Sequence, residues 1–239
     1  MGRKRKAGLI LVGCILAAAA ALAGYFMTYY HADEKAVQAL GSDEAVLVEK
    51  TEYGWHFDGP GEESVLIFYP GAKVEETAYA PLLHLLAGEG MDACLVRMSL
   101  RIALLGMDQA GKIIREGGYR QYYIGGHSLG GAAAAMYAGK NAEGLDGIVL
   151  LAAYPTGPLP DTLRAISIYG SEDGVVNRKR LEEGRQYLPG KAKEQVIAGG
   201  NHAGFGNYGP QKGDGLPKVD AAVQQVQTAE AILSWLQEP

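Results

Sequence analysis

The sequence predicts an α/β domain with a mostly parallel central sheet flanked by helices on both faces. Its 239 residues suit one domain of this class. Six short apolar runs, each ended by turn residues, recur along the chain, and such runs are typical of strands buried on both faces of a parallel sheet. Stretches with helical patterning separate most of these runs, as the alternation of strands and helices in an α/β domain requires.

The first elements of the body are a short helix and a hairpin. His31–Ser42 is polar and amphipathic, and it is expected to be a connector with a small helix. Ala45–Glu49 and Tyr53–Phe57 alternate apolar and polar residues across a short turn, which predicts an antiparallel hairpin at an edge of the sheet. No linker divides the later residues. We therefore expect a leader over 1–30, a connector over 31–44 and one folded domain over 45–239.

The remaining elements alternate along the chain. Buried strands are expected at Val65–Tyr69, Ala93–Arg97, Tyr122–Gly125, Gly147–Ala152, Ala165–Tyr169 and Gln195–Ala198. Helices are expected at Ala78–Ala87, Leu104–Glu116, Gly130–Ala138, Arg178–Leu188 and, with a clear apolar face, Val219–Gln237. Only the eleven residues Tyr154–Arg164 separate the fourth and fifth of these strands, which leaves no room for a cap domain over the sheet.

The N-terminus has the pattern of a membrane anchor. Arg3–Lys6 are all basic, and the 21 residues Ala7–Met27 carry no charge. About 20 apolar residues in a helix span the hydrocarbon core of a bilayer. Basic residues precede this stretch, and Asp33 and Glu34 follow it, so the start of the chain is expected in the cytoplasm and the body outside. The expected location is the cell membrane, with one transmembrane helix ahead of the domain.

The sequence of the leader also fits two alternatives to an uncleaved anchor. Ala21–Ala23 matches the small-x-small pattern of a signal-peptidase site, and cleavage near Ala23 would release a secreted protein. Leu11–Cys14 resembles a lipoprotein box. The apolar stretch continues beyond both sites, which favours the uncleaved anchor.

Charge argues against a nucleic-acid partner, and the cysteine content argues against disulfides and cysteine-based metal sites. Four of the 22 Lys+Arg lie in the leader, so the body carries 18 against 27 Asp+Glu, a balance of −9. An acidic body gives no electrostatic footprint for nucleic acid. Cys14 and Cys94 are the only cysteines, which supports neither a disulfide framework nor a cysteine-based metal site. Gly213–Gly215 does not follow the calcium-loop pattern, and no metal site is expected.

The strongest local signal is Gly126-His127-Ser128-Leu129-Gly130, between an expected strand and an Ala-rich helix. This is the G-x-S-x-G pattern of a nucleophile elbow in its strand-turn-helix setting. The turn is too tight for β-carbons at Gly126 and Gly130, and it projects the hydroxyl of Ser128 above the sheet. N–H groups at a helix start favour developing negative charge. Ser128 is therefore the expected nucleophile, and the Leu129 N–H is one expected oxyanion donor.

A serine hydroxyl needs a base to take its proton. His202 follows the last expected strand, at the carboxyl end where catalytic groups of open α/β sheets gather, and it is the expected base. The side chain of His127 is expected to point away from the hydroxyl. The other histidines lie on early parts of the chain, at His31, His56 and His84.

The third member of the site is expected between nucleophile and base in the chain. Asp173 lies in an acidic turn after the strand Ala165–Tyr169, where it would orient the imidazole of His202 and stabilise its charged form. Glu172 is the nearest alternative. The less well placed carboxylates are Asp146 and Asp161.

A second oxyanion donor is expected from the loop after the strand Val65–Tyr69. Pro70 has no N–H, and the N–H of Ala72 is the expected donor, with Gly71 and Lys73 as adjacent alternatives. Without a cap the substrate site is expected to be open. Three loops would then shape it: Ser99–Leu105, Tyr154–Leu159 and Ala203–Leu216.

Together, four segments resemble the α/β-hydrolase superfamily, and more narrowly a bacterial branch of single-domain hydrolases that often carry an N-terminal anchor: Phe68–Val74, Gly126–Gly131, Tyr169–Gly174 and Gly200–His202. The resemblance covers roughly Ala45 to the end. It implies the α/β-hydrolase fold, a Ser128–Asp173–His202 triad and no cofactor, with 45–239 as the catalytic domain. Many lipases have His-Gly before the oxyanion loop, whereas Tyr69–Gly71 stands here.

These residues favour a serine hydrolase of carboxylesterase or lipase type. It would cleave carboxylic esters or thioesters of small molecules through an acyl-enzyme on Ser128. A serine peptidase on the same fold is one alternative. A non-catalytic binding protein is another, because a fold alone does not give activity, but the complete set of nucleophile, acid and base argues against it.

Overall fold

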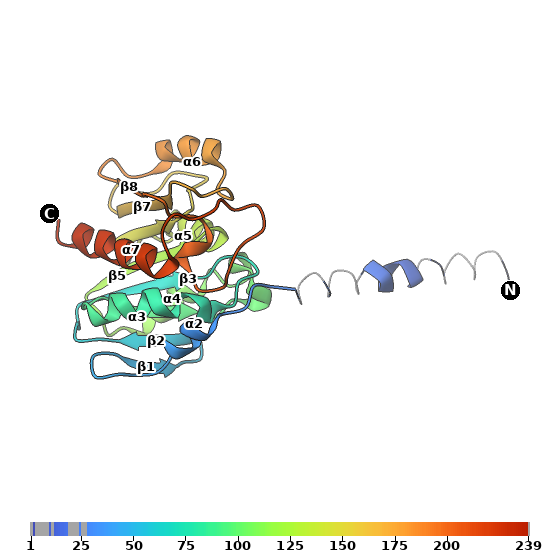
Figure 1. Ribbon diagram of the computed structural model, residues 1–239. Coiled ribbons are helices and arrows are strands. Elements are labelled where there is room, and N and C mark those ends of the chain that lie inside the picture. Colours follow the sequence, from blue (N-terminus) through green and yellow to red (C-terminus); the bar gives the residue numbers. More distant parts are fainter. Residues whose placement is uncertain (1, 3–9, 11, 19–23, 25–27, 239) are drawn as a thin grey trace.

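The sheet of the computed structural model has eight strands in the order β1-β2-β4-β3-β5-β6-β7-β8 (Figure 1). The structure describes residues 2, 10, 12–18, 24 and 28–238. The strands are β1 (Leu47–Lys50), β2 (Gly54–Asp58), β3 (Ser64–Tyr69), β4 (Asp92–Val96), β5 (Gln121–His127), β6 (Gly147–Leu151), β7 (Arg164–Gly170) and β8 (Lys193–Ile197). β1 and β2 form an antiparallel hairpin at one edge, and β3 to β8 run parallel. This mostly parallel sheet and its edge hairpin confirm the predicted fold class.

Helices follow most strands. They are α2 (Glu34–Gln38), α3 (Ala80–Gly88), α4 (Gln109–Glu116), α5 (Leu129–Ala138), α6 (Arg178–Gly184) and α7 (Ala221–Leu236). Short 3₁₀ turns are η1 (Glu76–Tyr79), η2 (Ser99–Arg101), η3 (Ala103–Leu105), η4 (Arg185–Tyr187) and η5 (Ala203–Phe205). The residues between β6 and β7 form neither helix nor strand, so no cap element covers the sheet there.

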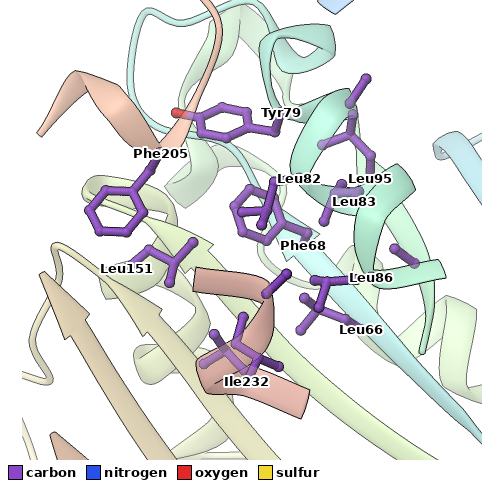
Figure 2. Close-up of a cluster of buried hydrophobic side chains, with 14 of the residues drawn as sticks. Leu66, Phe68, Tyr79, Leu82, Leu83, Leu86, Leu95, Leu151, Phe205 and Ile232 are labelled. Atoms are coloured by element: carbon purple, nitrogen blue, oxygen red, sulfur yellow. The ribbon is translucent and has the colours of Figure 1, made fainter. Parts of the chain in front are cut away.

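β3 shows why both faces of the sheet carry helices. Its apolar side chains alternate, with Leu66 and Phe68 in one buried cluster and Val65 and Ile67 in the other. Figure 2 shows the first cluster, where α3 supplies leucines and α7 supplies Ile232. Side chains of α4 and α5 fill the second cluster. Burial of each such side chain contributes about 1.5–3 kcal/mol, so a strand buried on both faces is the centre of the fold.

Strand order brings distant loops together at the carboxyl edge of the sheet. β3 pairs with β5 so that Tyr69 lies opposite Gly126, which places the loop after β3 beside the turn after β5. β7 pairs with β8 so that Gly170 lies opposite Ile197. The segments that hold Asp173 and His202 therefore leave neighbouring strands at the same edge.

The helix expected over Leu104–Glu116 is too long. The structure has η3 first, and α4 begins only at Gln109. Gly106 stands at the break, where an added Cβ would lie 2.8 Å from the Met98 sulfur. Leu104 and Leu105 are exposed and do not extend the apolar face of α4. Arg178–Leu188 likewise divides into α6 and η4.

The predicted transmembrane helix falls mostly on residues outside those described. Over the parts of the chain that the structure does describe, no helix has the length and apolar character needed to cross a membrane. The anchor over Ala7–Met27 therefore stays a prediction from the sequence.

Candidate active site

Ser128 occupies the turn between β5 and α5 in an unusual backbone conformation. Its φ is 55° and its ψ is −122°, a region that costs a residue with a side chain of order 1–3 kcal/mol and persists only where the surroundings enforce it. The Ser128 N–H donates to the Leu151 carbonyl at 2.9 Å. The Ser128 carbonyl accepts from the Ala132 N–H at 3.1 Å in the first turn of α5. The turn is therefore fixed from both sides.

Two glycines allow the chain to pack this tightly. A Cβ added at Gly126 would lie 2.5 Å from the Tyr69 carbonyl oxygen, and one at Gly130 only 2.1 Å from the same atom. Real contacts of this kind do not occur at such distances, so both positions require glycine. The steric reason expected for the G-x-S-x-G spacing is confirmed.

Asp173 and His202 form a buried pair. Oδ2 of Asp173 lies 2.8 Å from Nδ1 of His202, and both side chains are almost fully buried. Oδ1 of Asp173 accepts the N–H groups of Val175 and Val176, each at 2.8 Å. Burial raises the pKa of Asp173, but the bond to His202, its charge and these two N–H groups outweigh burial and lower the pKa overall. The carboxylate is thus ionised and orients the ring, and the buried Nε2 of His202 has no hydrogen-bond partner among the described residues.

The imidazole of His202 lies beside the serine turn. Its ring centroid is 4.4 Å from that of His127, the residue before Ser128. Within the described chain, the hydroxyl of Ser128 makes no hydrogen bond to His202. The structure therefore joins Asp173 and His202 directly and places the His202 imidazole next to the turn that holds Ser128.

His127 is held away from catalysis by a buried tyrosine. Its Nδ1 lies 2.8 Å from the hydroxyl of Tyr79. That hydroxyl also accepts the N–H of Gly71 at 3.0 Å, so its own proton is donated to Nδ1. Burial, with the charge of His202 as the second cause, lowers the pKa of His127 well below its usual value. A neutral His127 therefore ties the serine turn to the loop after β3.

That loop leaves one N–H group available near the serine. The Gly71 N–H is bonded to Tyr79, and the Lys73 N–H donates to the Arg101 carbonyl at 3.0 Å. No hydrogen bond to any described residue involves the N–H of Ala72. Leu129 is the first residue of α5, so its N–H has no acceptor within the helix. Ala72 and Leu129 thus remain the two candidate oxyanion donors.

Asp214 supports the site and was not found from the sequence. Its carboxylate accepts four main-chain N–H groups: Gly215 at 2.8 Å, Ala203 at 2.9 Å, Gly174 at 3.1 Å and His202 at 3.2 Å. It therefore joins the loop of the base to the loop of the acid. No sequence pattern in the glycine-rich segment around Asp214 indicates this role. Likewise, no pattern indicates that Tyr79, ahead of α3, contacts His127.

The other carboxylates have different surroundings. Glu172 is bound to Lys218 at 2.8 Å and to Ser171 at 3.0 Å, on the exposed side of the turn. Asp146 accepts the N–H of Tyr122 at the opposite edge of the sheet, and Asp161 accepts that of Gly190. Unlike Glu172, Asp146 and Asp161, Asp173 bonds to the imidazole of His202.

Two histidines and one cysteine outside the site have contacts that suit a structural role. His56 bonds to Tyr119 and His84 to Asp43. Cys94 is half-buried, and desolvation raises the pKa of its thiol to about 12. No cluster of potential metal ligands occurs in the described parts of the chain.

Residues 65–227 match the family described as the alpha/beta hydrolase family. The chain belongs to the alpha/beta hydrolase family. No curated protein sequence matches this hydrolase.

Solved structures agree on the fold. The hydrolase is similar to the esterase Est1E from Butyrivibrio proteoclasticus, with 13% identity and a TM-score of 0.55 over 82% of this chain and 100% of that one. An esterase from Mycobacterium tuberculosis gives 13% identity and 0.59 over 86% and 96%. A membrane phospholipase A, described as a bacterial virulence factor, gives 12% identity and 0.59 over 98% of each chain. At these identities the similarity shows the fold alone.

Proposed function

We propose that this alpha/beta hydrolase is a serine hydrolase of carboxylesterase or lipase type, which cleaves carboxylic esters or thioesters. One observation carries the proposal: a buried Asp173–His202 pair lies against the turn that holds Ser128 in a strained conformation. Strained serine turns of this kind expose the nucleophile of α/β hydrolases. The esterases among the structural relatives support an ester substrate.

The proposed reaction begins with proton transfer. Nε2 of His202 takes the proton of the Ser128 hydroxyl as its oxygen attacks the carbonyl carbon. Catalytic hydrogen bonds are often long without substrate and tighten when it binds. The N–H groups of Leu129 and Ala72 stabilise the oxyanion. Asp173 stays ionised and stabilises the imidazolium.

The tetrahedral intermediate then collapses to an acyl-enzyme, which water hydrolyses in a second stage. His202 gives its proton to the leaving alcohol or thiol, and the acyl group remains on Ser128 as an ester. A water molecule, deprotonated by the same imidazole, attacks this ester. The acid departs, and the hydroxyl of Ser128 regains its proton.

We also propose that the leader holds the enzyme in the cell membrane with the catalytic domain outside. The uncharged 21-residue stretch Ala7–Met27 and the basic residues before it support this orientation.

A labelling experiment tests the nucleophile. A fluorophosphonate probe should label the wild-type enzyme, and Ser128→Ala should abolish labelling, because the probe reacts only with an activated serine. Ser99→Ala is the matched control, since Ser99 is an exposed serine at the same edge of the sheet. Labelling of Ser128→Ala at the wild-type rate would show that another residue is the nucleophile.

A substrate panel tests the reaction. Esters of graded chain length should be hydrolysed beside thioesters, whereas peptides should be cleaved slowly. Cleavage of peptides without activity on esters would replace this proposal with a serine peptidase.

A further inference from the structure

The end of the leader meets the folded domain at the candidate active site. Tyr30 forms a parallel bridge with Val74. The Tyr30 N–H donates to the Lys73 carbonyl at 2.8 Å, and the Tyr30 carbonyl accepts from the Glu75 N–H at 2.9 Å. These residues follow Ala72, the candidate oxyanion donor. Residues 28–30 therefore run along the loop that borders the candidate active site, where the blue chain reaches the folded domain in Figure 1.

A second loop of the site packs on the same segment. The guanidinium of Arg101 lies 3.3 Å from the ring centroid of Tyr29, and the Arg101 carbonyl accepts the Lys73 N–H at 3.0 Å. η3, which follows Arg101 closely, packs against α5. Since α5 begins directly after Ser128, the loop of η2 and η3 connects the end of the leader to the helix that follows the proposed nucleophile.

The loop after His202 also reaches the leader. The N–H of Lys212 donates to the hydroxyl of Tyr30 at 3.1 Å, and the rings of Tyr30 and Tyr208 are 5.6 Å apart. The last residues of the leader are thus held by loops that carry or adjoin the candidate oxyanion donor, nucleophile and base. This junction fixes the leader at the carboxyl edge of the sheet.

Three leucines are exposed beside this junction. Leu100 is 56% exposed, Leu104 41% and Leu105 58%. Leu100 and Arg101 both have left-handed backbone conformations, with φ of 53° and 56°, which is rare for residues with side chains. We call these three side chains the leucine surface. Exposed apolar side chains gathered on one loop are typical of a contact site.

We propose that the leucine surface rests on a lipid bilayer and that the substrate is an acyl ester drawn from that bilayer. The uncharged stretch Ala7–Met27 ends just before Thr28, so the segment suited to lipid reaches the domain at this edge. Lys73 and Arg101 hold the end of the leader beside these leucines: the Lys73 amine donates to the Thr28 hydroxyl at 3.1 Å, and the Arg101 guanidinium lies over the Tyr29 ring. A lipid surface at this position explains the exposed apolar side chains. The choice of an ester rests on the proposed function, whereas the surface itself does not.

Fluorescence quenching tests the surface without any need for catalysis. Leu104→Trp is introduced into the full chain, which is reconstituted in phosphatidylcholine vesicles with brominated acyl chains. The emission of the added tryptophan should be quenched. Leu47→Trp is the control, because Leu47 is 49% exposed and begins β1 at the opposite edge of the sheet. Equal quenching at both positions, or none at position 104, overturns the leucine surface.

Hydrolysis tests the origin of the substrate. In the full chain, Leu100→Ser, Leu104→Ser and Leu105→Ser together should lower hydrolysis of a long-chain ester embedded in vesicles at least about tenfold. Hydrolysis of a soluble short-chain ester should fall much less than that of the embedded ester, and Leu47→Ser should change neither. An equal loss on both esters overturns the proposal. If position 104 is quenched but no ester is hydrolysed, the leucine surface stands and the proposed function fails.

Discussion

The neighbouring rings of His127 and His202 occupy different chemical environments. His127 is bound to Tyr79 and buried, whereas His202 is bound to the carboxylate of Asp173. Burial and the nearby charge of His202 lower the pKa of His127. Because His127 stays neutral, it adds no repulsive charge when His202 becomes an imidazolium. In the proposed reaction, His202 can therefore accept a proton with a second histidine in contact.

The depressed pKa of His127 predicts a loss of stability in acid. Unfolding exposes His127, and its pKa returns to about 6.5. Below that pH the unfolded chain binds a proton that the folded protein excludes, so the free energy of unfolding falls by up to about 1.4 kcal/mol per pH unit. His127→Gln can still accept the Tyr79 proton but does not titrate. Thermal melting of the full chain in mild detergent should drop less between pH 7.5 and 5.5 for this variant than for wild type.

The same experiment has an internal control. His84→Gln removes a histidine that is bound to Asp43 far from the site, and it should leave the acid sensitivity of the melting temperature near that of wild type. If His127→Gln melts with the same pH dependence as wild type, the buried ring is not the source of the acid sensitivity.

At the scale of elements, the carboxylate of Asp214 helps to join the loops after β7 and β8. Asp214 accepts N–H groups from both loops. In asparagine an NH2 group replaces one carboxylate oxygen, and its hydrogens would point toward main-chain N–H groups that this oxygen accepts in the wild type. Asp214→Asn should therefore shift His202 and lower kcat by about 10²-fold, because a misplacement of about 1 Å can cost that much. KM should change little. Steady-state kinetics on a soluble ester measure both constants.

Asp220→Asn is the matched control for this variant. Asp220 is exposed and its side chain makes no capping bond at α7, so kcat should be unchanged. A rise in KM at constant kcat for Asp214→Asn would show that the carboxylate shapes substrate binding instead of positioning the base.

Sequence patterns predicted the strands well because their signals are local. The apolar run at Val65–Tyr69 and the alternation of the hairpin mark buried and edge strands directly. The helix over Leu104–Glu116 was wrong because exposed leucines imitate an apolar helical face. The pattern cannot distinguish leucines that face the core from leucines that face solvent.

From the sequence, candidate site residues can be named only where a motif or the chain order marks them. The contact of Asp173 with His202, 29 residues apart, was expected from the order of residues along the chain. Tyr79 contacts His127 across 48 residues, and no sequence motif near Tyr79 predicts this contact. Supporting residues of this kind become visible only when strand pairing brings the loops together.

At the scale of the whole molecule, fractionation tests the location of the enzyme. The full chain with a tag at its C-terminus should be found in the membrane fraction at its full mass, because Ala7–Met27 is long enough to span a bilayer. Immunoblotting of membrane and medium measures this distribution. A shorter protein free in the medium would contradict the anchor and support cleavage near Ala23.

The position of α7 has a consequence for biosynthesis. Ile232 and Trp235 of this helix pack in the cluster around Leu66 of the central strand β3, although α7 is synthesised after all eight strands of the sheet. A nascent chain therefore contains Ser128 before α7 is available to complete this cluster. The proposed hydrolase should gain activity only after α7 has docked.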